Sequence, residues 1–453
     1  MNEKNTCFEN ISVPDLEKQI GILLYETDTC GIKGILRHRP EDFCVREISE
    51  IKTIPAGDSN KNAKHLVFEL TKTNWDTNHF LKAFSNCLGI SHKRVSYAGT
   101  KDKRAVTVQK MSVYDISAEE LEKVRMKDIS IQVIGRAQNP VSLGDLDGNY
   151  FKIIIRNIDF LPKEVKEMAD KTTAEIQASG GVPNFFGIQR FGTTRPMTHL
   201  VGQDILSGDL EKAVLRYIAE SYPDEPEHTK EARDYIAKTK DFKGGLAKMP
   251  DHLGHEKALL NHLISHPGDF KGAFMVLPKN LYTMFVHAYQ SYLFNQIICE
   301  RIRSGLSLNR AEIGDIVCYR KGNIPDPGRL ETVDVENVDG INHLLKRKRA
   351  FITAPLFGSE TPLASGVPGQ IERAVIEKTG FCADDFKVPA FSETASRGLR
   401  KEILLEAEPK TEVISDEDFP GKTALSIEFQ LPKGSYATTV LREYMKTDPK
   451  DMS

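Results

Sequence analysis

The sequence predicts an α/β fold in which strands and helices occur near both ends of the chain around an inserted middle domain. A chain of 453 residues exceeds the size at which one hydrophobic core keeps growing, so two or three domains are expected. Hydrophobic residues make up 40% of the sequence and charged residues 28%, the balance of a globular protein rather than a disordered one. The middle has helices of its own, with glycine-rich and proline-rich connections from about 304 to 369.

The N-terminal part carries strand patterns followed by a helix. Residues 34–47 predict a strand, a proline-bearing turn and a second strand. Residues 65–70 (HLVFEL) alternate apolar and other side chains, with the period of a half-buried strand. The next apolar pattern has helical spacing, with Asp76 and Thr77 as candidate caps and Gly89 placed to end it. Its apolar stripe consists of Phe80, Leu81, Phe84 and Leu88.

A polar segment, GTKDKR, separates two strand-like segments, RVSYAG and AVTVQKMSVY, so Asp102 is predicted to lie on a loop between two strands. Asp102 is the one acid among six cations in residues 91–110: Lys93, Arg94, Lys101, Lys103, Arg104 and Lys110. Such cations favour an ionised carboxylate that acts as a nucleophile or base, and they could also hold phosphates. On charge pattern alone, a surface turn is the commoner explanation, because aspartate is a frequent turn residue.

Later segments repeat the same mixture of elements. NYFKIIIRNI, from residue 149, predicts a strand, and residues 163–179 predict a helix before two glycines. A second long helix is predicted over 281–303, and ALSIEFQL and YATTVLREYMK predict a strand and a helix near the C-terminus. Residues 221–240 carry many charges and few large apolar side chains, so we interpret them as a solvated helix or excursion.

Several features predict a cytoplasmic location. The first residues lack the apolar stretch of a signal peptide, and no later segment reaches the roughly 18 to 20 apolar residues of a membrane span. Seven cysteines are scattered, odd in number and without a CxxC pair, which indicates reduced thiols. They are Cys7, Cys30, Cys44, Cys87, Cys299, Cys318 and Cys382.

The formal net charge is only −3, so any signal for nucleic-acid binding must be local. One local candidate is the run LLKRKR, which is either a phosphate contact or a solvated helix face. Its cations are Lys346, Arg347, Lys348 and Arg349. Residues 401–419, in contrast, carry seven acids against two bases and are expected to face away from RNA.

Residues 97–109 (YAGTKDKRAVTVQ) resemble the G-x-K-D-x-x-A-x-T-x-Q signature of the TruD family of transfer-RNA pseudouridine synthases, and every fixed position matches. Further blocks follow in the family's order and span nearly the whole chain. They are PEDFCVRE (40–47), VPNFFGIQRFG (182–192), YQSYLFNQ (289–296) and LPKGSYATTVLRE (431–443). The chain therefore resembles a larger, archaeal-type member of that family.

The resemblance implies roles for six residues. Asp102 matches the catalytic aspartate, Arg37 falls where the family places a basic residue able to pair with it, and Lys101 is the lysine beside it. The positions that match the lining of the uracil pocket are Phe43, Asn184 and Phe186. Other pseudouridine synthases usually have a tyrosine where this chain has Phe186, whose ring can stack on uracil but cannot exchange a proton.

The resemblance also implies an architecture and a substrate. Residues 1–197 and 396–453 would form the catalytic domain, around a mixed, largely antiparallel sheet with flanking helices. Residues 198–395 would form the inserted TruD-specific α/β domain, with RNA bound in the cleft between the two. The expected substrate is uridine 13 of transfer RNA. Residues 206–279 are longer than in the shorter bacterial relatives, which leaves substrate preference open.

The implied reaction breaks the bond from N1 of uracil to ribose C1′, turns the retained base, and joins C5 to C1′. It needs no redox cofactor, nucleotide or metal, and no obligate protein partner or membrane is evident. The sequence leaves open whether the aspartate attacks C1′, adds to C6 or deprotonates the ribose. Four histidines, His252, His255, His262 and His266, cluster in the sequence. The last two stand four residues apart, a spacing that suits a metal, but HLISH lacks the glutamate of an HExxH site.

Two other classes of function are compatible with parts of the pattern. A non-catalytic protein could keep the fold to bind or fold RNA, although the intact Asp102 argues against it. An aspartate-dependent glycosidase or nucleosidase would usually need a second carboxylate and an activated water, and the Asp102 loop offers no partner acid.

Overall fold

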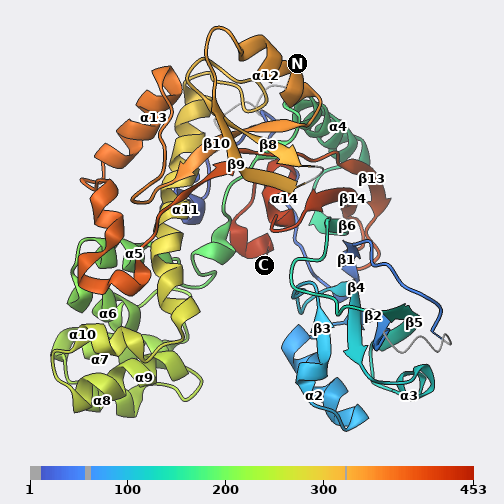
Figure 1. Ribbon diagram of the computed structural model, residues 1–453, viewed down its shortest axis with the longest axis horizontal. Coiled ribbons are helices and arrows are strands. Elements are labelled where there is room, and N and C mark those ends of the chain that lie inside the picture. The colour runs from blue at the N-terminus through green and yellow to red at the C-terminus, as the bar shows by residue number, and fades with distance from the viewer. Residues whose placement is uncertain (1–11, 57–62, 322–323, 453) are drawn as a thin grey trace. The chain divides into compact units, whose positions relative to one another are not determined.

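The computed structural model describes residues 12–56, 63–321 and 324–452. They form two compact units, built from segments that alternate along the chain (Figure 1). Within the described residues, unit 1 comprises 27–182 and 405–452, and unit 2 comprises 12–26 and 183–404. The described chain therefore runs from unit 2 through unit 1, back into unit 2 and again into unit 1. Residues 12–26, which were expected in the catalytic domain, belong to unit 2.

The unit boundaries differ from the domain boundaries expected at 197/198 and 395/396. Residues 183–197 supply Phe185, Ile188, Phe191 and Met197 to the hydrophobic core of unit 2. Ile403, beyond the second expected boundary, joins the same core. Burial of these apolar side chains, which a motif match does not report, assigns both segments to unit 2.

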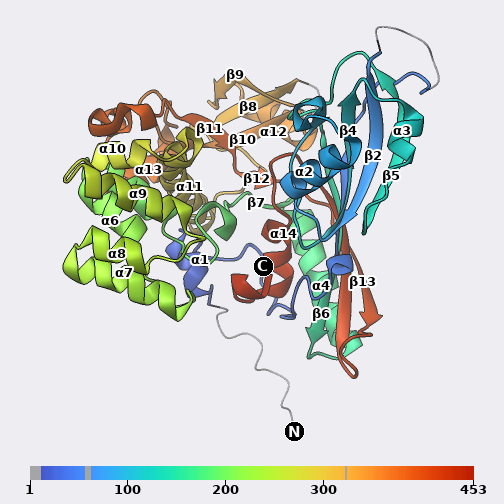
Figure 2. The same ribbon diagram turned by 90° about the horizontal axis from the view of Figure 1, so that it is seen from below.

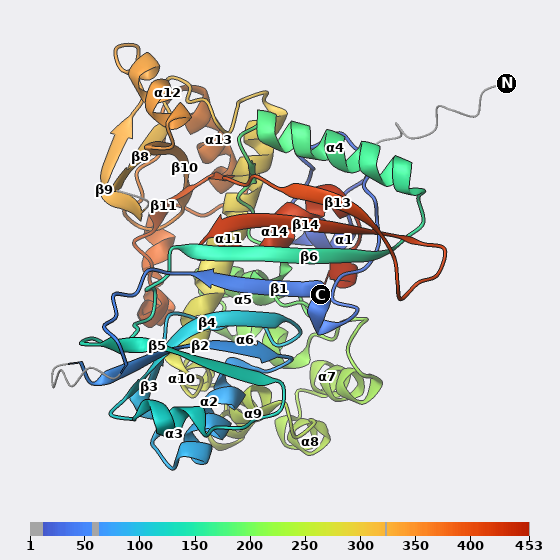
Figure 3. The same cartoon turned by 90° about the vertical axis from the view of Figure 1, so that its right-hand side faces the viewer.

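Unit 1 is built on an eight-stranded sheet in the order β13-β14-β6-β1-β4-β2-β5, with β3 paired to β4 (Figure 3). Among the described strands, β1 and β4 run parallel and the other neighbours run antiparallel, which confirms the predicted mixed, largely antiparallel sheet. The strands are β1 (Phe43–Ile48), β2 (His65–Thr73), β3 (Val95–Tyr97), β4 (Val106–Tyr114), β5 (Ile129–Ala137), β6 (Gly148–Ile158), β13 (Lys410–Ser415) and β14 (Thr423–Pro432).

The helices of unit 1 are α2 (Thr77–Leu88), α3 (Ala118–Glu122), α4 (Pro162–Ala178) and α14 (Ala437–Met445). As predicted, the Asp76 side chain caps α2, and Gly89 ends it with a left-handed φ of 65°, which glycine adopts without steric cost. Phe80 and Phe84 of α2 pack on Phe68 of β2 in one core. Helix α2 accordingly lies against this part of the sheet (Figure 2). A second core joins α4 and α14 to β1, β6 and β14.

Unit 2 surrounds one long helix, α11 (Lys279–Arg303), whose predicted span is confirmed and which is buried along most of its length (Figure 1). Its other helices are α1 (Asp15–Gln19), α5 (Thr198–Leu206), α6 (Leu210–Ala219), α7 (Glu227–Thr239), α8 (Phe242–Lys248), α9 (Gly254–Ser265), α10 (Phe270–Met275), α12 (Val338–Lys346) and α13 (Gly366–Glu377). A four-stranded sheet has the order β11-β10-β8-β9, from β8 (Ile316–Lys321), β9 (Ile324–Thr332), β10 (Ala350–Leu356) and β11 (Leu399–Glu402).

Shorter elements complete the description. Two-residue strands, β7 (Val182–Pro183) and β12 (Leu404–Leu405), lie where the chain passes from one unit to the other and pair with each other. The 3₁₀ helices are η1 (Pro40–Asp42), η2 (His92–Arg94), η3 (Ile188–Arg190), η4 (Ala383–Lys387), η5 (Pro389–Thr394) and η6 (Pro449–Met452).

The structure describes only some of the residues that were used to predict a cellular location. In the part of the chain that the structure describes, no helix combines the length and apolarity needed to cross a membrane. No disulfide joins the six described cysteines. The N-terminal residues 1–11, with Cys7, lie outside the described residues.

The interpretation of residues 221–240 as a solvated excursion is wrong for their central charges. Arg233 on α7 is 1% exposed and donates to Glu225 at 2.8 Å, to Glu256 at 2.9 Å and to the Tyr217 carbonyl at 3.0 Å. Because the charges satisfy one another, the apolar face of α7 can pack into the core with the arginine buried beside it. A count of charges along the sequence does not reveal this pairing.

Arg233→Ala should lower the free energy of unfolding by about 3–5 kcal/mol, because Glu225 and Glu256 lose the cation closest to them and keep only the longer contacts with Arg195, at 3.5 and 3.4 Å. Lys163→Ala removes an exposed lysine that lies 3.8 Å from Glu167 and is the matched control, with an expected loss below about 1 kcal/mol. Urea denaturation of both variants measures the difference. Equal losses would contradict a structural role for the Arg233 network.

Candidate active site

Hydrogen bonds from α2 and from β4 hold the backbone of the loop that carries Asp102, residues 98–105. The Thr77 hydroxyl at the start of α2 accepts a hydrogen bond from the Lys101 amide at 3.1 Å. The Gln109 side chain on β4 donates to the Gly99 carbonyl at 3.3 Å. The Asp102 side chain nevertheless remains 57% exposed. The loop thus presents an accessible carboxylate from a fixed backbone, between two strands as predicted.

Arg37 approaches that carboxylate from the segment before β1. Its Nη2 lies 2.6 Å from Asp102 Oδ2, a short charge-assisted hydrogen bond. Its guanidinium carbon lies 4.1 Å from the centroid of the Phe43 ring. Arg104 donates to the Arg37 carbonyl at 2.8 Å and holds its backbone. The structure therefore brings together three of the six predicted residues: Arg37, Phe43 and Asp102.

A buried arginine supports the turn from which Arg37 projects. Arg156 on β6 is 3% exposed and contacts Asp42 at 2.7 Å and Asp416 at 3.0 Å. Its backbone pairs with Ile35, directly before the turn. Asp416 belongs to the acidic stretch 401–419, so at least this acid neutralises a cation inside unit 1.

Lys72, which the sequence analysis did not single out, lies beneath the Asp102 loop. It is fully buried in unit 1 and donates to the Asp102 carbonyl at 3.2 Å and to the Trp75 carbonyl at 2.5 Å. Burial lowers its pKa to about 8, against the opposing effect of Asp76 and Asp102. Its position two residues after Leu70, on the apolar face of β2, is the sequence signal that could have identified it.

Lys101 faces into the protein in this structure. Its ammonium lies 2.8 Å from Glu47 Oε2, and the two side chains are 6% and 0% exposed. A buried carboxylate such as Glu47 requires a cation beside it, and Lys101 supplies that cation. Lys101 thus forms a buried ion pair next to the loop, and the substrate binding that the family resemblance implies for Lys101 stays a prediction.

Phe43 is also largely internal. Its side chain is 2% exposed and packs edge-on against Phe151, with ring centroids 6.3 Å apart. The Arg37 guanidinium covers the ring as well. In this structure Phe43 belongs to the core of unit 1, and the Arg37 guanidinium packs on its ring.

Asn184 and Phe186 belong to unit 2, where they lie beside the end of β11. The Asn184 amide side chain donates to the Glu402 carbonyl at 2.9 Å. Phe186 donates its backbone N–H to Asn295 Oδ1 at 2.9 Å, and the Asn295 amide donates back to the Phe186 carbonyl at 3.0 Å. The half-buried Phe186 ring meets Phe294 edge-on at 5.5 Å. Both predicted residues are thus held in defined positions within their own unit.

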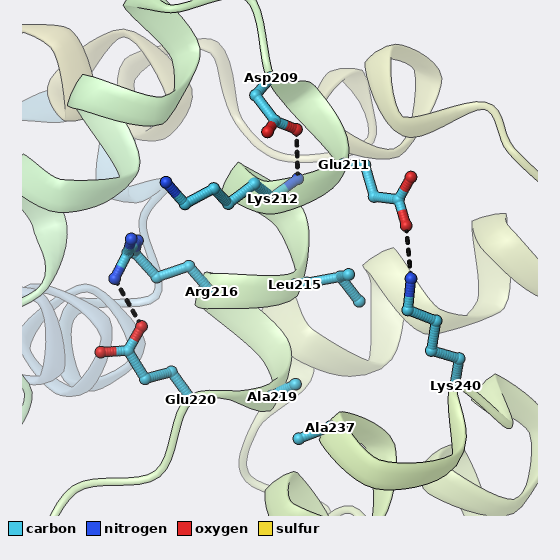
Figure 4. A pocket seen from close by; sticks show the side chains of 9 residues that line it. All are labelled: Asp209, Glu211, Lys212, Leu215, Arg216, Ala219, Glu220, Ala237 and Lys240. Atoms are coloured by element: carbon cyan, nitrogen blue, oxygen red, sulfur yellow. Dashed lines mark hydrogen bonds and ion pairs between the residues drawn. The ribbon is translucent and has the colours of Figure 1, made fainter.

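An open groove in unit 2 contains none of the predicted residues (Figure 4). Its charged walls pair internally, Lys240 with Glu211 at 2.8 Å and Arg216 with Glu220 at 2.7 Å. Its lining residues are Asp209, Glu211, Lys212, Leu215, Arg216, Ala219, Glu220, Ala237 and Lys240. None of the catalytic or substrate-binding residues predicted from the sequence lines this groove.

The remaining candidates are the histidine cluster and the basic run. His262 pairs with Asp269 at 3.0 Å and stacks on His266, and no three described His, Cys, Asp or Glu side chains gather as metal ligands. The four cations of LLKRKR are all exposed. Lys346 ends α12, and the next three form the turn into β10. They therefore lie at a helix end and turn rather than along a helix face.

Comparison with known proteins identifies the family. A family model described as tRNA pseudouridine synthase D (TruD) matches residues 19–444. The chain belongs to the TruD family. A Methanosarcina acetivorans relative described as a probable tRNA pseudouridine synthase D is 54% identical over 444 residues, covering 98% of this chain and 99% of its own. A Methanosarcina barkeri relative with the same description is 53% identical, with coverages of 98% and 100%.

A solved structure extends the similarity to three dimensions. A crystal structure of a Methanosarcina mazei protein assigned to TruD has a TM-score of 0.90 and 54% sequence identity to this chain. The match covers 97% of this chain and 100% of the other. The TruD family resemblance and the α/β fold class predicted from the sequence are both confirmed.

Lys72→Met should loosen the Asp102 loop, because it keeps the apolar stem but removes the ammonium that donates to the loop carbonyls. We expect amide hydrogen exchange to accelerate in residues 98–105. Lys110→Met is the matched control, since Lys110 also lies on the unit 1 sheet but donates to the Ser49 carbonyl instead. Unchanged exchange in the loop of the Lys72 variant would show that Lys72 does not support it.

Proposed function

We propose that this TruD protein is a transfer-RNA pseudouridine synthase that isomerises uridine 13, with Asp102 as its nucleophile. The observation that carries the proposal is the half-exposed Asp102 carboxylate, paired at 2.6 Å with Arg37 on a loop tied to α2 and β4. The family match supports the substrate class, since its members are described as tRNA pseudouridine synthases.

The ion pair supports a nucleophilic role because it occupies one carboxylate oxygen and leaves the other available. Arg37 binds Asp102 Oδ2, and Oδ1 has no hydrogen-bond partner in the described part of the chain. The short charge-assisted hydrogen bond from the guanidinium fixes the orientation of the carboxylate. Attack at C1′, addition at C6 and removal of a ribose proton all require a carboxylate oxygen that no protein group already binds, and Oδ1 would serve in each. The proposal therefore holds for any of the three paths.

The remaining roles follow the contacts of each residue. Phe43 would position Arg37 rather than stack on the base, since the guanidinium covers its ring. Asn184 and Phe186 would contact uracil, with the half-buried Phe186 ring as the stacking surface. Lys103 and Arg104, both exposed beside Asp102, would contact phosphates next to the extruded nucleotide.

Product analysis distinguishes this proposal from the alternatives. The purified protein is incubated with unmodified transfer RNA, and pseudouridine is mapped. The proposal requires pseudouridine at position 13, and no product when that position is changed to cytidine. Unchanged RNA would favour a non-catalytic RNA-binding protein. An abasic RNA with free uracil would favour a glycosidase.

Asp102→Asn and Asp102→Ala should abolish isomerisation while RNA affinity stays within a few fold, because the carboxylate takes part in bond breaking rather than in phosphate contact. Asp115→Asn, at an exposed aspartate after β4, is the matched control and should keep full activity. Single-turnover assays and equilibrium binding measure both effects. Measurable turnover by Asp102→Ala would refute the nucleophile assignment.

The exposed LLKRKR turn is proposed as a phosphate contact. Lys346→Ala combined with Arg347→Ala should weaken RNA binding and reduce the slope of log affinity against log salt by roughly one for each phosphate that is no longer bound. Lys163→Ala combined with Lys166→Ala removes two exposed cations from α4 and serves as the control. An unchanged slope in the first pair would mean that the turn is only solvated.

A further inference from the structure

Lys401 on β11 extends its side chain over two aromatic rings of unit 2. Its ammonium nitrogen lies 5.2 Å from the centroid of the Phe186 ring and 5.5 Å from that of Phe294. Burial lowers the pKa of Lys401 to about 8, against the opposing effect of Glu402. In the described part of the chain, no hydrogen bond or ion pair engages this ammonium. The Lys401 ammonium therefore has hydrogen-bond donors but no acceptor among the described residues.

The neighbouring groups do not satisfy Lys401. An ammonium carries three N–H donors, and ring faces attract its charge without accepting strong hydrogen bonds. The adjacent carboxylate, Glu402, is bound by Arg320 at 2.5 Å, and successive side chains of a strand point to opposite faces. Lys401 is partly buried, so its ammonium gives up some hydration without gaining an acceptor from the described residues. An oxygen acceptor supplied by a ligand would offset that loss.

The backbone around Lys401 is joined to the Phe186 segment. Asn184 donates its backbone N–H to the Ile403 carbonyl at 2.8 Å and its side-chain amide to the Glu402 carbonyl at 2.9 Å. Asn295 fixes the Phe186 backbone through two hydrogen bonds. The ring of Phe186 and the ammonium of Lys401 are therefore held side by side by contacts made within unit 2. A nucleotide base that reached Phe186 would meet Lys401 as well.

We propose that Lys401 binds an oxygen acceptor of the nucleotide whose base stacks on Phe186, so that the ring and the ammonium recognise the substrate together. The acceptor is either a uracil carbonyl oxygen or a phosphate oxygen of the same nucleotide. This inference rests on the proposed function, because it uses Phe186 as the ring that receives the base. It adds a binding residue at the first position of the stretch 401–419, which was expected from its acidic composition to face away from RNA.

The test compares Lys401→Met, which keeps the stem but removes the charge, with Lys401→Arg, which keeps a cation. Unmodified transfer RNA is the probe, and equilibrium affinity and single-turnover rate are measured. Lys401→Met should lose about tenfold to a hundredfold in affinity or in rate, the size expected for one hydrogen bond to a charged group. Lys401→Arg should recover most of the loss. Lys378→Met, at an exposed lysine after α13, is the control and should match the wild type.

Salt dependence identifies the acceptor. If Lys401 binds a phosphate, the slope of log affinity against log salt falls by about 0.7 to 0.9 in Lys401→Met. If it binds a uracil carbonyl, the slope stays unchanged and the loss falls on the single-turnover rate at saturating RNA. Either result supports the proposal. Melting curves check that each variant is folded, and Lys401→Gln replaces Lys401→Met if the latter is not.

The outcomes separate this inference from the proposed function. A wild-type protein that forms no pseudouridine would refute the proposed function, and RNA affinity and its salt slope would still decide whether Lys401 contacts the nucleotide. A folded Lys401 variant without the charge that matches the wild type in affinity, slope and rate would overturn the inference. Lys401 would then only pack against the two rings.

Discussion

The parallel pairing of β1 with β4 is the constraint on which the candidate active site depends. Cys44 lies opposite Val106 in this pair, so the segments that precede both strands emerge at the same edge of the sheet. One of these segments carries Arg37 and the other carries Asp102. An antiparallel pair would separate them by the length of β1, about 20 Å for six residues. The 2.6 Å contact between the two side chains follows from this parallel pairing, since the other neighbouring strands that the structure describes in this sheet run antiparallel.

Buried charges hold the loops of this protein in place. Arg156 supports the turn that carries Arg37, Lys72 supports the backbone of Asp102, and the Lys101–Glu47 pair fixes the residue before it. A buried charge is costly without a partner, and replacing such a pair with apolar side chains often stabilises a protein. Here the charges instead bind backbone carbonyls and carboxylates at defined positions. Their consequence is a fixed geometry around an exposed carboxylate, which catalysis by positioning requires.

Unit 2 uses aromatic side chains in a comparable way. Asn295 binds the backbone of Phe186 on both sides, and Phe294 meets its ring edge-on, so α11 determines where the ring lies. The Lys401 ammonium lies 5.2 Å from the centroid of that ring. A rigid ring beside a cation combines a stacking surface with a hydrogen-bond donor, the two elements by which single nucleotides are usually recognised.

The sequence by itself determined the features whose causes are local. Asp76 and Gly89 mark the two ends of α2, and the alternation of HLVFEL marks β2, because caps and hydrophobic periods act over a few residues. It also placed Asp102 on a loop between strands. The family resemblance implied that Arg37 could pair with Asp102, and the structure shows that contact. Only the tertiary structure decided that Lys101 turns to Glu47 and that Arg233 is buried. A charged side chain takes its direction from a partner distant in sequence, and no local pattern records which partner the fold brings near.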